Sequence, residues 1–273
     1  MAPRLLTIAS LMVFGFGCVA PVDGSDPNAG GPGIGGKADG DEEAAAPDVE
    51  TVAAEPPALA PAFQIRFDST IERQRGDGSV ETYVASFRGW ASVRQEGSTA
   101  HFVVHACSTT LPRISDRQPV LRDSTVRSAL AVPVEGYLVQ DEEGQWRLAS
   151  DTAALTLGVR LEHPVDDELP NDRYDPRVVD ADEDEAPGVS MSVSVFSIYV
   201  GLRVKFWLEG VLDASGGISG EPELGLDFAI YGDSVPFFDA REEAAKSLGS
   251  ATGLSHHDRL VMTPLATATP SCQ

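Results

Sequence analysis

Three acidic residues at alternating positions, Asp180, Asp182 and Asp184, are the part of this sequence best suited to chemistry. Alternate carboxylates on a tightly turned backbone point at one ion, and calcium prefers such oxygen ligands. An EF-hand is excluded, because that motif needs glycine after the third acid and a final glutamate, where this chain has Glu185 and Met191. Two interpretations remain open, a weak calcium site and a solvated acidic loop.

The sequence contains no motif of an established catalytic class, such as a nucleophile elbow, a zinc-protease pair or a phosphate loop. His101 and His105 would share one face of a strand with Cys107, but the two histidines would be about 13 Å apart at the rise of a strand. That separation is too long for one metal ion. A hydrolase that uses scattered carboxylates stays open as an alternative.

The three cysteines fall into two groups. Cys18 ends an apolar run, whereas Cys107 and Cys272 lie in the remainder of the chain. If Cys18 carries a lipid, an even pair remains, and an oxidising compartment favours a disulfide between Cys107 and Cys272. Two free buried thiols are the alternative.

Residues 1–17 are predicted to be a signal peptide. Arg4 precedes an apolar stretch over residues 5–16, which suits an export signal and is too short to cross a bilayer. Gly17 and Cys18 resemble the end of a bacterial lipobox, so we expect lipidation at Cys18, with cleavage after Ala20 by the ordinary signal peptidase as the alternative. The expected location is the cell envelope, as an outer-membrane lipoprotein on the periplasmic face or the cell surface.

Residues 18–61 are predicted to be a lipidated, disordered, acidic linker. From Val19 the segment consists mainly of Gly, Pro, Ala and acidic residues, with no aromatic side chain before Phe63. Such a composition buries too little apolar surface to offset the entropy of the chain. It predicts a spacer between a membrane and a folded domain.

Residues 62–273 are predicted to be a single all-β domain. Apolar and polar residues alternate repeatedly, as in Phe63, Ile65 and Phe67, and strands with one solvated face belong to antiparallel sheets. We expect an antiparallel meander of about nine or ten strands, which forms either a barrel or a sandwich. One short helix is predicted from an N-cap at Asp239 to a stop at Gly249.

The charge of the chain restricts its partners. Twenty Lys and Arg residues against 42 Asp and Glu residues give a formal net charge of −22, so we expect no nucleic-acid partner. The expected partners are a lipid membrane, through the N-terminal anchor, and an apolar ligand or another envelope protein. No cofactor is indicated except calcium.

The leader, the tether GGKADGD, the Ala106-Cys107 strand end, the block from Asp175-Pro176-Arg177 to Gly188-Val189 and the terminal cysteine together resemble uncharacterised lipoproteins of myxobacteria and their relatives. The resemblance covers most of the folded region and implies export and lipid anchoring, but no activity. The function expected is therefore that of a lipid-anchored envelope protein with a non-catalytic binding or structural β domain. A carboxylate hydrolase and a calcium-stabilised interaction module are the alternatives.

Overall fold

The structure is a computed structural model that describes residues 54–74, 79–111, 119–193, 196–222, 224–234, 254–267 and 270–272. Within these ranges the chain forms thirteen β-strands and one short helix, α1 (Asp123–Arg127). The predicted all-β fold is therefore confirmed. The predicted signal peptide, Cys18, residues 18–53 of the predicted linker and the helix predicted over Asp239–Gly249 lie outside the described residues.

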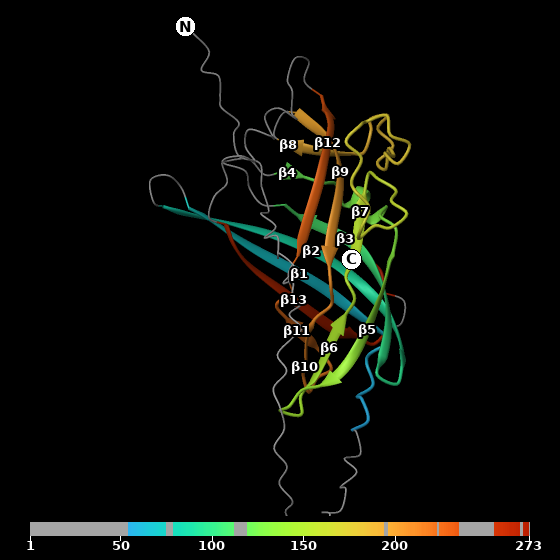
Figure 1. Ribbon diagram of the computed structural model, residues 1–273, viewed down its shortest axis with the longest axis vertical. Helices are drawn as coiled ribbons and strands as arrows, with labels where there is room; N and C mark the ends of the chain where they lie inside the picture. Colours follow the sequence, from blue (N-terminus) through green and yellow to red (C-terminus); the bar gives the residue numbers. More distant parts are fainter. Residues whose placement is uncertain are drawn as a thin grey trace, which may run out of the picture. The chain divides into compact units, whose positions relative to one another are not determined.

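Eight strands form a closed antiparallel barrel (Figure 1). In hydrogen-bonded order they are β1 (Ala62–Gln74), β13 (Leu254–Leu265), β11 (Ile218–Gly220), β10 (Gly210–Leu212), β6 (Trp146–Ser150), β5 (Val132–Gln140), β3 (Thr99–Thr110) and β2 (Val80–Glu96). Closure leaves no sheet edge in the barrel itself, so its backbone groups pair around the whole circumference. The sequence left a barrel and a sandwich open, and the structure contains a barrel.

A second sheet accompanies the barrel. Its strands are β12 (Gly225–Asp233), β9 (Phe196–Phe206), β8 (Val189–Val193), β4 (Pro119–Val120) and β7 (Ala153–Leu157). β9 pairs with β12 along one side; on its other side β8 pairs with its first half and β7 with its second half. The strands β4, β10 and β11 are only two or three residues long, too short for alternation to reveal them in the sequence.

Alternation along the strands places one continuous apolar core inside the barrel and under the second sheet. Phe63 and Ile65 of β1 have no exposed surface, and Leu148 of β6 is equally buried. The Phe67 ring of β1 meets the Phe206 ring of β9 edge-on, with centroids 5.7 Å apart, and joins the barrel to the second sheet. Each such buried side chain contributes roughly 1.5–3 kcal/mol, so the core is the main source of stability.

The folded unit begins before residue 62. It includes Pro56 and the residues after it. Gln95 of β2 accepts a hydrogen bond from Leu59 N at 2.7 Å and donates one to Pro57 O at 3.0 Å. The composition of residues 18–61 assigns Pro57 and Leu59 to the linker, whereas in the structure the Gln95 side-chain amide bonds their backbone groups.

The predicted disulfide between Cys107 and Cys272 is present. Their Cα atoms are 5.3 Å apart across a separation of 165 residues in the sequence. The bond links the C-terminal residues covalently to β3.

The described residues include no helix with the length and hydropathy that a membrane crossing requires.

Candidate metal site

The three aspartates lie in a long excursion between β7 and β8, over residues 158–188, whose one strand-like feature is the isolated bridge between Val159 and Val178. A glycine occupies each end of this excursion. Gly158 and Gly188 have φ of +72° and +90°, and a Cβ on either would lie within 2.7 Å of Val200 O in β9. Only glycine fits at these two positions, where the excursion leaves and rejoins the second sheet.

The backbone around the aspartates is tightly turned. Asp180 accepts hydrogen bonds from Asp184 N at 3.2 Å and from Glu185 N at 2.8 Å. Glu183 and Glu185 both adopt left-handed conformations, with φ of 58° and 66°. Non-glycine residues rarely do so. Glu185 thus provides the turn for which calcium loops normally use glycine.

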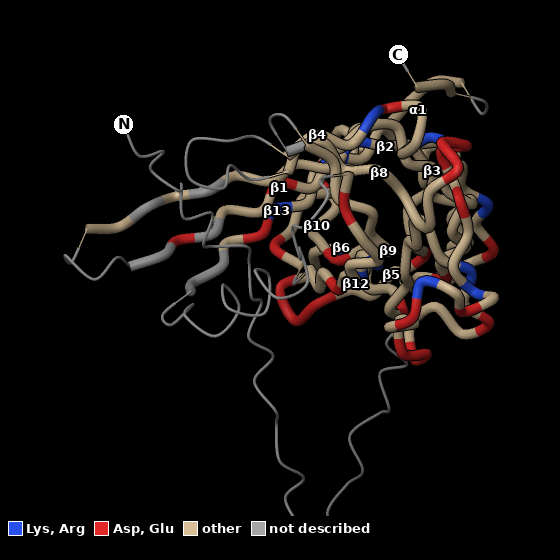
Figure 2. Tube along the Cα trace, turned by 90° about the horizontal axis from the view of Figure 1, so that it is seen from above, with Lys and Arg blue, Asp and Glu red and all other residues tan. Residues whose placement is uncertain are grey.

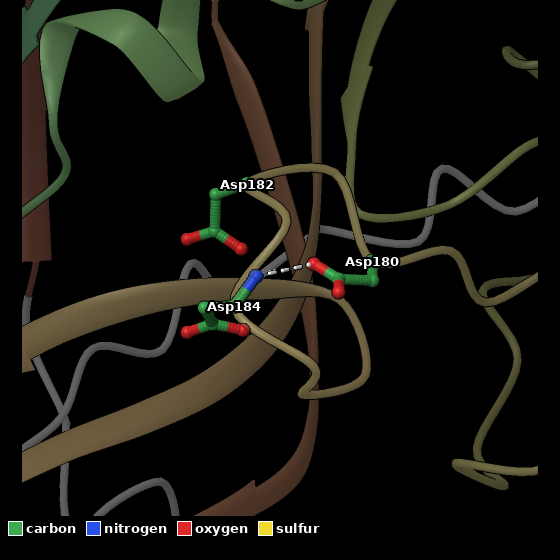
Figure 3. Close-up of side chains that lie close together, drawn as sticks. All are labelled: Asp180, Asp182 and Asp184. Atoms are coloured by element: carbon green, nitrogen blue, oxygen red, sulfur yellow. Dashed lines mark hydrogen bonds between the residues drawn. The ribbon is translucent and has the colours of Figure 1, made fainter.

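This turn brings the three carboxylates together (Figure 3). One oxygen of each of Asp180, Asp182 and Asp184 lies within 4.8 Å of the others. Asp182 Oδ2 accepts a hydrogen bond from Ser190 N at 2.9 Å, while Asp182 Oδ1 is buried without a partner. Burial raises the pKa of the Asp182 carboxyl, and the charges of Asp184 and Asp180 raise it further, against the Ser190 N–H.

Two contacts hold the excursion in place. Ser128, the residue after α1, has its hydroxyl oxygen 3.2 Å from Ala181 O, although that hydroxyl lies closer to Thr125 O, at 2.7 Å. Arg203 of β9, only 7% exposed, donates to Pro164 O at 3.2 Å and to Asp167 O. The loop that carries the aspartates is therefore attached to the second sheet through Arg203 and contacts the residue after the helix.

The site places three carboxylates around one point, and hydrogen bonds from backbone N–H groups hold Asp180 and Asp182 in position. Carboxylate oxygens suit a hard cation, and calcium accepts six to eight oxygen ligands in flexible geometry, with water completing a partial set. Among the described residues, this is the one cluster of three or more groups with metal-ligating spacing. The residues that the sequence singles out for calcium are therefore brought together.

The histidines of β3 do not form a metal site with each other. His101 Nδ1 lies 3.6 Å from a carboxylate oxygen of Glu135 on β5. His105 stacks on Trp90 of β2, with ring centroids 3.9 Å apart and planes 13° apart. The sequence does not predict this stack, because the two rings become neighbours only through the pairing of β2 with β3.

No family model matches this chain, and neither the curated proteins nor the solved structures include a significantly similar one.

Proposed function

We propose that this chain is an exported, lipid-anchored protein of the cell envelope whose β domain binds a partner or has a structural role, without catalysis. The observation that carries the proposal is the disulfide between Cys107 and Cys272, because such bonds persist in oxidising, exported compartments. The apolar leader that ends at Cys18 supports the same compartment and supplies the anchor.

The packing of the barrel supports a partner at the surface. Its inward residues are apolar and many are large, and Phe102, Leu260 and Met262 are at most 1% exposed. A barrel interior occupied by such side chains is a packed core. An envelope protein that docks on the outside of the domain therefore fits this proposal better than an apolar ligand inside it.

Lipidation at Cys18 is tested by metabolic labelling with a palmitate analogue. We expect the Cys18→Ser variant to lose the label and to move from the membrane fraction to the soluble fraction, since one thioether carries the anchor. A Cys107→Ser/Cys272→Ser variant, matched in chemistry, should keep the label. A Cys18→Ser protein that stays in the membrane fraction would contradict the anchor.

The hydrolase alternative is tested separately, with a panel of glycan and ester substrates. Turnover that a single carboxylate substitution abolishes would replace the non-catalytic proposal by this alternative. Absence of turnover with every substrate would support the binding or structural role.

A second function, a calcium-stabilised interaction module, is favoured by one specific observation. Asp182 Oδ1 is buried without a hydrogen-bond partner, beside two further carboxylates. A buried, unpaired oxygen of a carboxylate is costly. A bound cation would supply the missing partner and neutralise the mutual repulsion of the three charges.

We expect 10 mM calcium to stabilise the protein by about 1.4 kcal/mol, for a dissociation constant of about 1 mM, and to raise Tm by roughly 3–6 °C. Differential scanning calorimetry of the full chain measures this shift. The Asp182→Ala variant should lose it, whereas Glu162→Ala, an equal change of charge at an exposed position of the same excursion, should keep it. Equal shifts in both variants would contradict a site at Asp182.

A further inference from the structure

The outer face of the barrel carries a pair of stacked rings. Trp90 and His105 are directly opposite each other in the β2–β3 register, and both are partly exposed. Their neighbours Ala91 and Val104 point inward and are buried. The two rings therefore belong to the outside of the barrel, where nothing in the core requires a large aromatic pair. Burial lowers the pKa of the His105 imidazole, which favours its neutral form.

Two arginines occupy the adjacent row of the same face. Arg66 of β1 and Arg88 of β2 are directly opposite each other, and both are exposed. Like charges at directly opposite positions of an antiparallel pair are destabilising. Asp68 offsets part of this repulsion through its ion pair with Arg66, at 2.7 Å, but no ion pair of Arg88 is found among the described residues.

Gln64 of β1 completes this surface, because it is exposed and directly opposite Trp90. We call Gln64, Arg66, Arg88, Trp90 and His105 the arginine–tryptophan face. The protein around it is strongly acidic, with a formal net charge of −22, and red acidic segments are more extensive than blue basic ones along the described trace (Figure 2). Two exposed arginines beside an aromatic pair therefore form a locally positive surface on an acidic protein.

We propose that the arginine–tryptophan face binds an acidic saccharide, with its carboxylate at Arg66 and Arg88 and a sugar ring against Trp90. Guanidinium groups match carboxylates in geometry and charge. The electron-rich face of an indole attracts the C–H groups of a sugar ring. Gln64 and the neutral His105 supply donors and acceptors for hydroxyl groups.

This site goes beyond the proposed function and does not depend on the lipid anchor. An acidic peptide without proline or aromatic residues would use the arginines alone, because it has no ring to place on Trp90. The aromatic pair is thus the reason for a saccharide rather than a peptide.

The test uses the full chain in detergent, with a galacturonic-acid oligosaccharide and a neutral galactose oligosaccharide of equal length as probes. Calorimetry and tryptophan fluorescence should detect binding of the acidic probe only. Arg88→Gln should weaken that binding about tenfold, the effect of one charged hydrogen bond. Arg147→Gln, at an exposed outward position of β6, should leave it unchanged.

Trp90→Leu should weaken binding of the acidic oligosaccharide to a similar degree. If circular dichroism shows that this variant does not fold, the comparison of Arg88→Gln with Arg147→Gln decides, because both positions are exposed. Equal binding of the neutral probe, or equal losses in the two arginine variants, would overturn the proposal. So would binding of polyglutamate at the same affinity with no effect of Trp90→Leu.

Discussion

Replacement of both Cys107 and Cys272 by serine is expected to lower the free energy of unfolding by about 5 kcal/mol, the loop-entropy value for a cross-link of this span. The disulfide closes a loop across 165 residues, which includes five of the eight barrel strands and the whole second sheet. Without it, the unfolded chain gains conformational freedom. Since domains are typically stable by 5–15 kcal/mol, the variant should unfold at much lower urea concentration.

The control for this experiment is reduction of the unsubstituted protein. Dithiothreitol should bring its urea midpoint down to that of the double variant and should leave the double variant itself unchanged. Cys18→Ser should match the unsubstituted protein, because Cys18 takes no part in the cross-link. A difference below about 1 kcal/mol, or two free thiols by mass spectrometry, would contradict a stabilising disulfide.

Alternation predicts the barrel strands because it follows from strand geometry alone. Successive side chains of a strand point to opposite faces, so Phe63, Ile65 and Phe67 must face the core if one of them does. The structure buries all three almost completely. The pairing partners are less predictable, since 179 residues lie between the end of β1 and the start of β13 and nothing local specifies that contact.

Alternation fails where a backbone turn interrupts it. Leu155, Leu157, Val159 and Leu161 alternate as one strand in the sequence, but β7 ends at Leu157. Gly158 turns the chain there, with φ of +72°. Val159 and Leu161 then pack in a small separate cluster with Tyr231. A single glycine inside an apolar pattern does not reveal such a turn.

The acidic excursion over residues 158–188 likewise has one feature that the sequence predicts and one that it does not. The spacing of Asp180, Asp182 and Asp184 is a local property, and the structure brings their carboxylates together as that spacing predicts. The positive φ at Glu185 is not predictable, because glutamate seldom adopts it. From the sequence, glutamate at this position argues against a calcium loop, whereas the structure retains the turn.

The largest difference from the sequence concerns Arg203. Alternation along β9 assigns it to a solvated face, yet it is only 7% exposed, because the excursion over residues 158–188 covers that face. Its partner Asp227 lies directly opposite on β12, and a carboxylate oxygen of Asp227 is 2.6 Å from Arg203. A buried arginine needs such a partner, since an unpaired buried charge is strongly unfavourable.

We therefore expect Asp227→Leu to lower the free energy of unfolding by about 3 kcal/mol, because it leaves the Arg203 guanidinium uncompensated. The double variant Arg203→Met/Asp227→Leu should recover part of this loss, since it removes both charges. The exposed pair of Arg94 and Glu96 provides the control, and Glu96→Leu should change stability by less than about 1 kcal/mol. Urea unfolding measures all three variants. If the double variant were less stable than Asp227→Leu by the full cost of a second independent substitution, the two residues would not be coupled. The attachment of the acidic excursion to β9 would then not depend on this ion pair.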